Sequence, residues 1–383
     1  MSAARHVPIR LGQVGGGVGA FIGDVHRIAS RIDGDFTLVA GALSSTAAKA
    51  EESAAALGIA PDRTYSDWAE MAKAEAARED GIEAVAICTP NHLHVPVAKA
   101  FLAEGIHVIC DKPLAASLDE ARELQAVADA SDAAFVLTHN YSGYPLVREA
   151  KAMVARGDLG QLRVVQVEYP QDWMTDAVEK QGVKQAEWRS DPERAGLGGA
   201  TGDIGTHAYH LARFVSGLRL ERLAADLSAF VPGRVLDDNA HVMLRFEGGV
   251  KGMLWCSQIA PGHENGLRLR IFGDKGGIEW FQEEPNVLWH TTHGEPPRRL
   301  TRGGPGTNGG GTRIPPGHPE GYLEGFATIY ADAARLIRAR QAGEEPPEGL
   351  DLPDIRDGVE GVAFVAACVR SSGRDAAWVE LDR

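Results

Sequence analysis

The first 140 residues alternate short apolar runs with longer, alanine-rich stretches of helical composition. We predict strands for the apolar runs at residues 9–14, 37–42, 84–88, 107–110 and 134–137. Helices are predicted between them, for example at 46–57 and 118–130. Strands that alternate with helices in this way form βαβ units with a parallel sheet. We therefore predict a doubly wound α/β domain over residues 1–140.

The pattern changes after residue 140. A predicted helix at 145–156 leads into residues 162–169, which alternate between apolar and polar as a half-buried strand does. Further strand candidates at 223–230, 240–246, 250–258, 267–272 and 277–281 follow in hairpin order. This order predicts an α+β domain over residues 141–383 with a large, mostly antiparallel open sheet. Residues 302–317, rich in Gly and Pro, predict a surface loop, and 321–340 a helix.

Length, composition and charge narrow the function. With 383 residues the chain is too long for a single ordinary hydrophobic core, so we expect two domains. No apolar run reaches the roughly 18 residues of a membrane span. The four cysteines are far apart in the sequence, so we expect buried free thiols and a cytoplasmic location. No His, Cys or Asp spacing is typical of a zinc site, and we expect no metal. The formal net charge of -14 argues against nucleic acid and anionic membranes as partners.

A glycine-rich turn follows the first predicted strand. Within residues 15–20, Gly15, Gly17 and Ala20 occupy the key places of the G-x-G-x-x-A pattern. In a Rossmann domain these places permit a tight turn, approach of the backbone to a pyrophosphate, and close packing of the following helix. We predict a dinucleotide site here, to which Val18, Phe21 and Ile22 also contribute. The alternative is a glycine-rich turn that binds no ligand.

The residues after the second predicted strand leave the cofactor open. An acidic residue usually binds the ribose hydroxyls of NAD at this place, whereas this chain has Leu43-Ser44-Ser45. Ser44, Ser45 and the nearby Lys49 are candidates for binding either ribose hydroxyls or a 2′-phosphate. Because no Arg stands beside them, we predict NAD, with NADP as the alternative.

Two polar motifs, Thr89-Pro90-Asn91 and Asp111-Lys112-Pro113, follow the third and fourth predicted strands. Ligands of open α/β sheets bind at the carboxyl ends of the strands. A lysine fixed at a strand end beside a carboxylate can bind a reacting oxygen, and the alternative for Lys112 is an ordinary surface lysine. The predicted cofactor contacts from these motifs and from the end of the domain are Thr89, Pro90, Asn91, His94, Asp111, Lys112, Pro113 and Asn140.

Asp203 and His207 stand four residues apart where a glycine-rich turn is predicted to open a helix. At this spacing both side chains share one helix face. A carboxylate and an imidazole beside a cation can take a proton from a substrate hydroxyl. The alternative is a helix-capping acid and a buried structural histidine, and we interpret most of the other histidines as structural.

Together, Gly15-x-Gly17, Thr89-Pro90-Asn91, Asp111-Lys112-Pro113 and the 202–207 motif resemble the Gfo/Idh/MocA family, which is named for glucose-fructose oxidoreductase and inositol dehydrogenase. The resemblance covers nearly the whole chain, and within the family it is nearest to bacterial inositol dehydrogenases of the scyllo-inositol and L-glucose type. It implies a catalytic triad of Lys112, Asp203 and His207. Asp111 departs from the Glu that the family usually has.

The resemblance implies that the protein is an NAD(P)-dependent oxidoreductase. The expected reaction is the oxidation of a ring hydroxyl of a cyclitol or pyranose, without a metal. His207 is the expected base, Lys112 binds the same oxygen, and Asp203 orients the substrate. Polyol rings need several polar partners. For Tyr169, Trp173 and Arg189, the alternative is that the side chain only packs in the core or on the surface. The substrate candidates are Asn140, Tyr169, Gln171, Asp172, Trp173, Arg189 and His318, with Asp203 and His207.

Three other functions stay open. One is a pyranoside or anhydrosugar 3-dehydrogenase, which would use the same residues. The others are a non-catalytic dinucleotide-binding regulator and an NAD-dependent glycosidase. The predicted open sheet leaves one face without a cover, so we also expect a homodimer or homotetramer.

Overall fold

The computed structural model describes residues 7–382, which form two compact units. Unit 1 comprises the chain up to Ala115 together with Asp119–Gly143 and Tyr322–Gly358. Unit 2 comprises Ala116–Leu118, Tyr144–Gly321 and the chain from Val359. The predicted boundary at residue 140 is close to the end of Asp119–Gly143, but it assigned residues 322–358 to the second domain. The structure differs there, because this segment packs into the core of unit 1.

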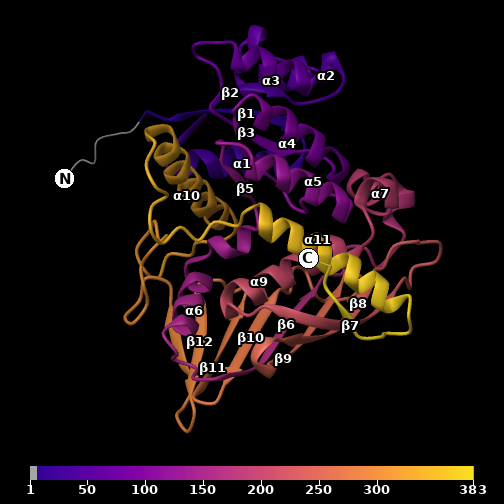
Figure 1. The fold of residues 1–383 in the computed structure, drawn as a ribbon, viewed down its shortest axis with the longest axis vertical. Coiled ribbons are helices and arrows are strands. Elements are labelled where there is room, and N and C mark those ends of the chain that lie inside the picture. Colours follow the sequence, from indigo (N-terminus) through magenta and orange to yellow (C-terminus); the bar gives the residue numbers. More distant parts are fainter. Residues whose placement is uncertain (1–6, 383) are drawn as a thin grey trace. The chain divides into compact units, whose positions relative to one another are not determined.

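Unit 1 is built on a five-stranded parallel sheet in the order β2-β1-β3-β4-β5 (Figure 1). Its strands are β1 (Ile9–Gly15), β2 (Phe36–Ala42), β3 (Ala84–Cys88), β4 (His107–Cys110) and β5 (Phe135–Leu137). Its helices include α1 (Phe21–Ile32), α2 (Ala47–Leu57), α3 (Trp68–Ala76), α4 (His94–Ala103), α5 (Leu118–Asp129) and α10 (Tyr322–Ala342). The predicted doubly wound parallel sheet is confirmed, strand by strand.

Helix α10 returns to unit 1 because its apolar face completes that core. Phe326, Ile329, Tyr330 and Ile337 are buried in the same hydrophobic cluster as Val25 of α1 and Ile9 and Leu11 of β1. Burying a large apolar side chain contributes about 1.5–3 kcal/mol. The helix was predicted from its local pattern, but the surface that it covers depends on contacts distant in the sequence.

Unit 2 contains a nine-stranded sheet in the order β13-β12-β11-β10-β6-β9-β8-β7-β14. All neighbours are antiparallel except β6 and β9, so the predicted mostly antiparallel sheet is confirmed. The strands are β6 (Leu162–Pro170), β7 (Leu220–Ser228), β8 (Asn239–Phe246), β9 (Lys251–Ser257), β10 (Arg268–Gly273), β11 (Gly276–Phe281), β12 (Val287–Thr292), β13 (Arg298–Thr301) and β14 (Val379–Glu380). The last three were not predicted.

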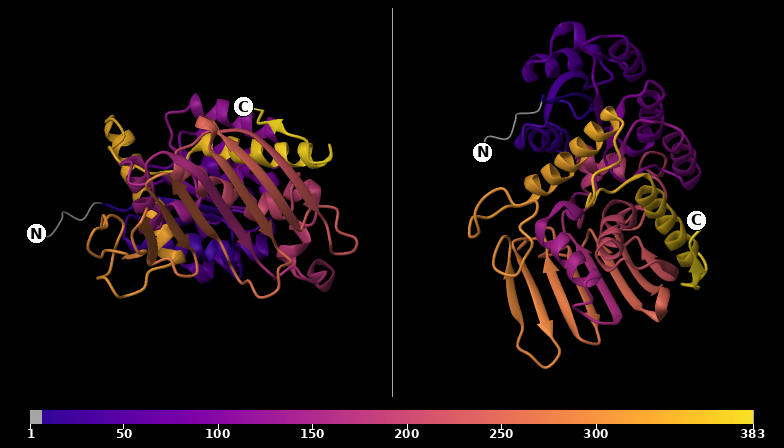
Figure 2. Two further views of the ribbon diagram at one scale, coloured as in Figure 1. Left: turned by 90° about the horizontal axis from the view of Figure 1, so that it is seen from below. Right: turned by 60° about the vertical axis from the view of Figure 1, so that its left-hand side comes forward.

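The two faces of this sheet differ. Helices α6 (Pro145–Ala155) and α9 (Thr206–Ser216) pack on one face, and α7 (Lys184–Arg189), α8 (Pro192–Ala195) and α11 (Ile355–Ser372) complete the helices of this part of the chain. Figure 2, left, shows the other face, over which none of the described helices of unit 2 lies. Large apolar side chains are exposed from its strands, namely Met243, Met253, Phe272 and Trp289.

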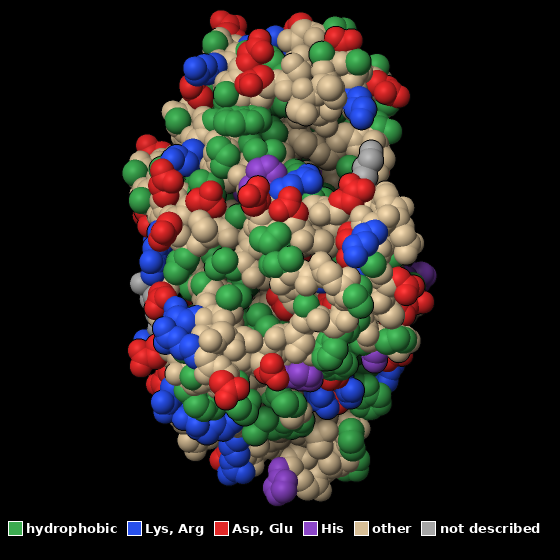
Figure 3. All heavy atoms as spheres, turned by 90° about the vertical axis from the view of Figure 1, so that its right-hand side faces the viewer, with side chains coloured by type: hydrophobic (Ala, Val, Ile, Leu, Met, Phe, Trp, Pro, Cys, Tyr) green, Lys and Arg blue, Asp and Glu red, His purple; other side chains and the backbone are tan. Residues whose placement is uncertain are grey.

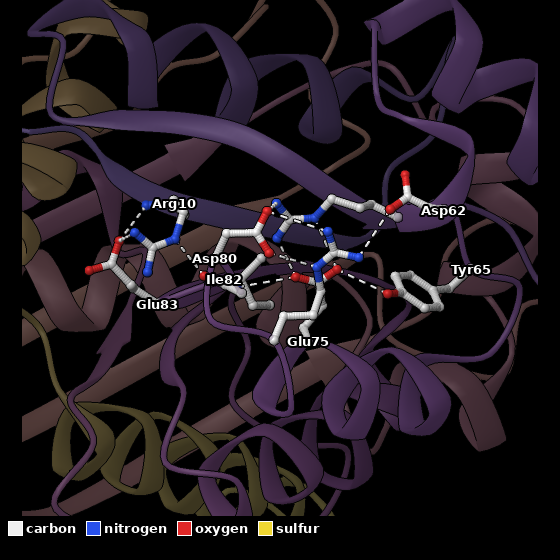
Figure 4. Close-up of polar contacts among 10 residues, drawn as sticks. Arg10, Asp62, Tyr65, Glu75, Asp80, Ile82 and Glu83 are labelled. Atoms are coloured by element: carbon white, nitrogen blue, oxygen red, sulfur yellow. Dashed lines mark hydrogen bonds and ion pairs between the residues drawn. The ribbon is translucent and has the colours of Figure 1, made fainter.

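A buried ion pair fixes the connection between β2 and β3 in unit 1. Glu75 of α3 is 1% exposed and pairs with Arg63, which is 7% exposed. The same carboxylate accepts hydrogen bonds from the Tyr65 hydroxyl at 3.0 Å and from the Ile82 amide at 3.2 Å (Figure 4). Burial and the adjacent Glu75 raise the pKa of Tyr65 to about 12. One buried carboxylate therefore holds three segments together.

The predicted loop at 302–317 lies between β13 and α10 and is anchored by a second buried pair. Arg302 is 3% exposed and Glu320 is 5% exposed, and Arg302 Nη1 lies 2.9 Å from Glu320 Oε1. The Arg302 guanidinium also donates to the Asn286 side chain at 2.8 Å and to the Ile314 carbonyl at 3.0 Å. Glu320 accepts from the amides of residues 313 and 314. Side chains from the two ends of the loop therefore hold its second half, at residues 313 and 314.

Three further findings concern the chemistry that the sequence suggested. Cys88, Cys110, Cys256 and Cys368 are buried free thiols, as predicted. Within residues 7–382, no group of three His, Cys, Asp or Glu side chains is arranged to hold a metal ion. Over the same residues, no helix is long and apolar enough to cross a membrane.

Candidate active site

The glycine-rich turn between β1 and α1 has the shape of a phosphate cradle. Gly15 and Gly16 have φ values of 73° and 63°, which favour glycine. A Cβ on Gly17 would lie 2.8 Å from the Leu43 carbonyl, so the backbone there approaches its surroundings without a side chain. Helix α1 starts after Ala20 with no side-chain cap. Its first amides therefore face the place where a pyrophosphate binds in such domains.

Several residues that the sequence analysis missed support this turn. Gln13 is fully buried and donates from Nε2 to the carbonyls of Gly15 and Gly16, each at 3.0 Å. Arg27 donates to the same Gly16 carbonyl. Gly23 packs against Gly16 so closely that an added Cβ would lie 2.1 Å from the Gly16 oxygen. Close helix packing, which we assigned to Ala20, therefore depends on Gly23.

The remaining predicted cofactor contacts of the turn and of the β2 end are exposed or half-buried. Val18 and Phe21 are each 59% exposed, and the Val18 amide donates to the Ser53 hydroxyl at 3.3 Å. Ile22 is half-buried. After β2, the Ser44 hydroxyl accepts from the Thr46 amide at 3.2 Å. Ser45 and Lys49 are exposed.

The carboxyl ends of β3 and β4 bring two predicted motifs together, because these strands are adjacent and parallel. His94 joins the two motifs: its Nδ1 lies 2.6 Å from the Pro113 carbonyl and its Nε2 lies 2.9 Å from the Thr89 carbonyl. Burial lowers the pKa of His94. His94 is fully buried, so its position supports a role in fixing these loops. Pro90, Lys112 and the cis-linked Pro113 are half-buried, and Asn91 and Asn140 are buried.

In unit 2, Asp203 lies in one turn of π-helix, Thr201–Gly205, that runs directly into α9. Such turns occur often at functional sites. Asp237 fixes the start of this turn, because its carboxylate accepts from the Gly199 amide at 2.7 Å and from the Thr201 amide at 2.8 Å. Burial raises the pKa of Asp237. The sequence predicted the helix but neither the π-turn nor the role of Asp237.

Two side chains orient the Asp203 carboxylate. Its Oδ2 accepts from Arg189 Nε at 3.1 Å and from Gln258 Nε2 at 2.9 Å. Gln258 is 3% exposed and lies just beyond β9. Arg189, which we predicted to contact substrate, is therefore engaged with a predicted catalytic residue. Gln258 ends a strand that was predicted from the sequence, and a polar residue at a strand end was the signal that could have identified it.

His207 lies on α9, is 8% exposed, and has the ring of Tyr169 beside it, with centroids 6.3 Å apart. Asn265 connects Tyr169 to the next predicted candidates. Its Oδ1 accepts from the Tyr169 hydroxyl at 2.7 Å and from Gln171 Nε2 at 2.8 Å. Trp173 Nε1 donates to Gln171 Oε1 at 3.0 Å. These side chains form one hydrogen-bonded wall, and Asn265 was missed by the sequence analysis.

The last two candidates lie differently. The Asp172 carboxylate accepts from the Gly262 amide at 3.1 Å, within the loop after β9. His318 is exposed just after the 302–317 loop, and its carbonyl accepts from Arg302. Their contact with substrate stays a prediction.

Comparison with known proteins identifies the chain's relatives. Residues 10–139 match the model of an oxidoreductase family with an NAD-binding Rossmann fold, and residues 147–279 match the Gfo/Idh/MocA C-terminal domain. The chain belongs to the Gfo/Idh/MocA family. The resemblance inferred from the motifs is thus confirmed, as are an oxidoreductase and an NAD-binding domain. The cradle at Gly17 and the uncapped start of α1 fit that cofactor.

Solved structures and curated relatives of this Gfo/Idh/MocA protein match almost end to end. An oxidoreductase from Sinorhizobium meliloti is 57% identical, with a TM-score of 0.90 and coverage of 98% of this chain and 100% of that chain. An inositol dehydrogenase homologue from Azotobacter vinelandii, complexed with NADH and myo-inositol, is 36% identical, with a TM-score of 0.92 and 97% of each chain covered. Levoglucosan dehydrogenase of Pseudarthrobacter phenanthrenivorans is 28% identical over 97% of this chain and 98% of its own.

Proposed function

We propose that this protein is an NAD-dependent dehydrogenase that oxidises a secondary ring hydroxyl of a cyclitol or pyranose to the ketone or lactone. The observation that carries the proposal is the oriented Asp203 carboxylate near His207 in the chain, with Tyr169 beside that imidazole and linked to Asn265 and Gln171. A wall of aromatic rings and amides is suited to a ring that carries several hydroxyls. Inositol and levoglucosan, the compounds named for two relatives, belong to this class.

In the proposed reaction His207 takes the proton of the substrate hydroxyl while the hydrogen on the same carbon leaves as a hydride and the carbonyl forms. NAD supplies the acceptor of that hydride. Lys112 donates a hydrogen bond to the reacting oxygen, and its ammonium stabilises the developing negative charge. Asp203 stabilises the imidazolium that forms on His207. Lys112 belongs to unit 1, whereas Asp203 and His207 belong to unit 2. The meeting of these residues around one substrate is part of the proposal.

The charges on the unit 2 side of the site favour an uncharged substrate over a phosphorylated one. Arg189 is paired with Asp203 and its guanidinium lies 4.3 Å from the centroid of the Trp188 ring. A phosphate would need a cation that is not already compensated. On the face drawn in Figure 3, Lys and Arg side chains are interspersed with Asp and Glu over most of the surface and are densest toward its lower left.

A 3-dehydrogenase of anhydrosugars or pyranosides is the second candidate. It is favoured by the relation to levoglucosan dehydrogenase over nearly the whole chain. The same His207 and Lys112 would serve, so only the identity of the oxidised sugar separates the two candidates.

We further propose that a second copy of the chain covers the helix-free face of the sheet, giving a homodimer or homotetramer. Met243, Met253, Phe272 and Trp289 are each 41% exposed or more on its strands. Apolar side chains clustered on one face are typical of interaction sites. Light scattering of the purified protein measures the assembly, and a monomer at micromolar concentration would contradict it.

The test of the reaction is absorbance at 340 nm with NAD, then NADP, against inositols, D- and L-glucose and anhydrosugars. Reduction with a cyclitol or pyranose is expected. His207→Ala should lower turnover by about 10²-fold or more, with NADH still bound. His293→Ala, which removes an exposed histidine between β12 and β13, is the control and should keep full turnover. Bound NAD without any reduction would instead favour a regulator or an NAD-dependent glycosidase.

A further inference from the structure

Asn265, in the loop between β9 and β10, is the centre of the hydrogen-bonded wall. Its Oδ1 accepts from the Tyr169 hydroxyl at 2.7 Å and from Gln171 Nε2 at 2.8 Å. Its Nδ2 donates to Gln282 Oε1 at 2.9 Å, and its backbone amide donates to a carboxylate oxygen of Glu283 at 2.9 Å. Both the side chain and the backbone of this residue are therefore held in place.

The direction of these hydrogen bonds is set by Trp173, because an indole N–H can only donate. It donates to Gln171 Oε1 at 3.0 Å, so the amide nitrogen of Gln171 faces Asn265. Asn265 must then present its oxygen to Gln171, which leaves its nitrogen for Gln282. Since an amide oxygen cannot donate, the hydrogen of the Tyr169 hydroxyl points toward Asn265. One group that only donates thus fixes the order of the whole network.

The Asn265 side chain holds a buried tyrosine beside the proposed base. Tyr169 is 3% exposed, and its ring is tilted by 58° from that of His207. A buried hydroxyl that loses its acceptor costs free energy, so the bond to Asn265 favours one position of the ring. The loop itself is docked by its backbone, because the Gly266 amide donates to the Pro170 carbonyl at 3.0 Å. A change of the Asn265 side chain therefore removes side-chain bonds and leaves that backbone bond in place.

We propose that Asn265 is a positioning residue of the active site, which fixes the Tyr169 ring beside His207 while the substrate hydroxyl reacts. The same carboxamide sets the orientation of Gln171 and, through it, of Trp173. This inference rests on the proposed function for the roles of His207 and of the wall. All these residues belong to unit 2, whereas the glycine-rich cofactor turn belongs to unit 1. The effect of Asn265 therefore falls on the sugar or polyol and not on NADH.

The test compares Asn265→Leu, which cannot accept a hydrogen bond, with Asn265→Asp, which keeps the acceptor oxygen. In Asn265→Leu the Tyr169 hydroxyl and the Gln171 amide lose this acceptor, and kcat/KM for the oxidised polyol should fall by about 10- to 100-fold. The dissociation constant of NADH should stay that of the parent protein. Asn265→Ala, a second variant without an acceptor, should give the same loss.

Asn265→Asp should recover most of the lost kcat/KM. Gln282 can turn its amide over to donate to the new carboxylate, because the Tyr144 hydroxyl, 3.4 Å from Gln282 Nε2, can donate as well as accept. Recovery by a residue that keeps only the acceptor oxygen identifies that oxygen as the group that acts. Parent-like kcat/KM in Asn265→Leu and Asn265→Ala, or a loss in Asn265→Asp as large as theirs, would overturn the proposal.

A second readout needs no substrate. In protein labelled with 5-fluorotryptophan, the ¹⁹F NMR signal of Trp173 is assigned by its loss in Trp173→Phe. This signal should move in Asn265→Leu and keep its place in Asn265→Asp, while that of Trp289 on β12 stays fixed in both and reports an intact sheet. If the Trp173 signal moves but the parent protein oxidises no polyol, the proposed function fails and the positioning role of Asn265 in the wall stands. An unmoved Trp173 signal in an active enzyme would refute that role alone.

Discussion

Replacing Gly23 with Ala tests whether the cofactor turn depends on close packing of α1. The Cβ of the new residue would lie 2.1 Å from the carbonyl oxygen of Gly16 and 2.6 Å from its Cα. Both partners are backbone atoms, which cannot rotate away as a side chain does. The Gly16 oxygen also accepts from Gln13 and Arg27, so a shift of the turn would disturb these bonds as well.

The magnitude follows from the distances. The contact must open by about 1 Å to reach the 3.0 Å that real Cβ atoms keep. Such a displacement is enough to lose one hydrogen bond from the turn to a phosphate, which costs about 1.5–3 kcal/mol for a charged acceptor. The dissociation constant of NADH should therefore rise by about 10- to 100-fold.

Titration of NADH fluorescence or calorimetry measures that constant directly. The matched control is Gly361→Ala in α11, where an added Cβ meets no atom within 4 Å. The control should bind NADH as the parent protein does. In a helix without a clash, Ala is more stabilising than Gly by about 1 kcal/mol. If Gly23→Ala raised stability and left NADH binding unchanged, the argument from close packing would be refuted.

Three further predictions concern Asp203, Glu75 and His107. Gln258→Leu removes one of the two side-chain donors to the Asp203 carboxylate, and kcat should fall by about tenfold with NADH binding unchanged; an unaltered kcat would contradict this role. Glu75→Gln removes the buried counter-charge of Arg63 and leaves it only the exposed Asp80 at 3.7 Å, and urea denaturation should show a loss of about 3–5 kcal/mol. Burial lowers the pKa of His107 to about 4, so the unfolded chain binds its proton first and stability should fall as the pH drops from about 6.5 to 4. In His107→Asn, which can still accept from the Ala134 amide, this part of the pH dependence should disappear.

The elements that were predicted correctly are those whose signal lies within a few residues. The strands of the parallel sheet are short apolar runs bounded by polar turns, and their burial on both faces requires that composition. The glycine turn was equally clear, because Gly15 and Gly16 adopt positive φ values that other residues rarely adopt. Strands β12 and β13 were missed because they mix polar residues with apolar ones at the end of a half-exposed sheet.

The catalytic candidates were identified by motif, whereas their supporting residues were not. Asp203 and His207 share one short segment, so their spacing is visible in the sequence. Gln258 and Asn265 lie more than 50 residues further along the chain. Packing of β9 against the π-helical turn brings Gln258 to Asp203, and the pairing of β10 with β6 brings Asn265 to Tyr169.

The sequence by itself determined the two kinds of sheet, the dinucleotide turn and the residue types of the site, because each depends on local periodicity or local backbone conformation. Only the tertiary structure decided that α10 belongs with the first sheet, that Gly23 provides the close contact with Gly16, and that Tyr330 of α10 lies beside His26 of α1. These features arise from packing between segments that are distant in the chain. Such packing depends on shape and burial in three dimensions, which no local pattern encodes.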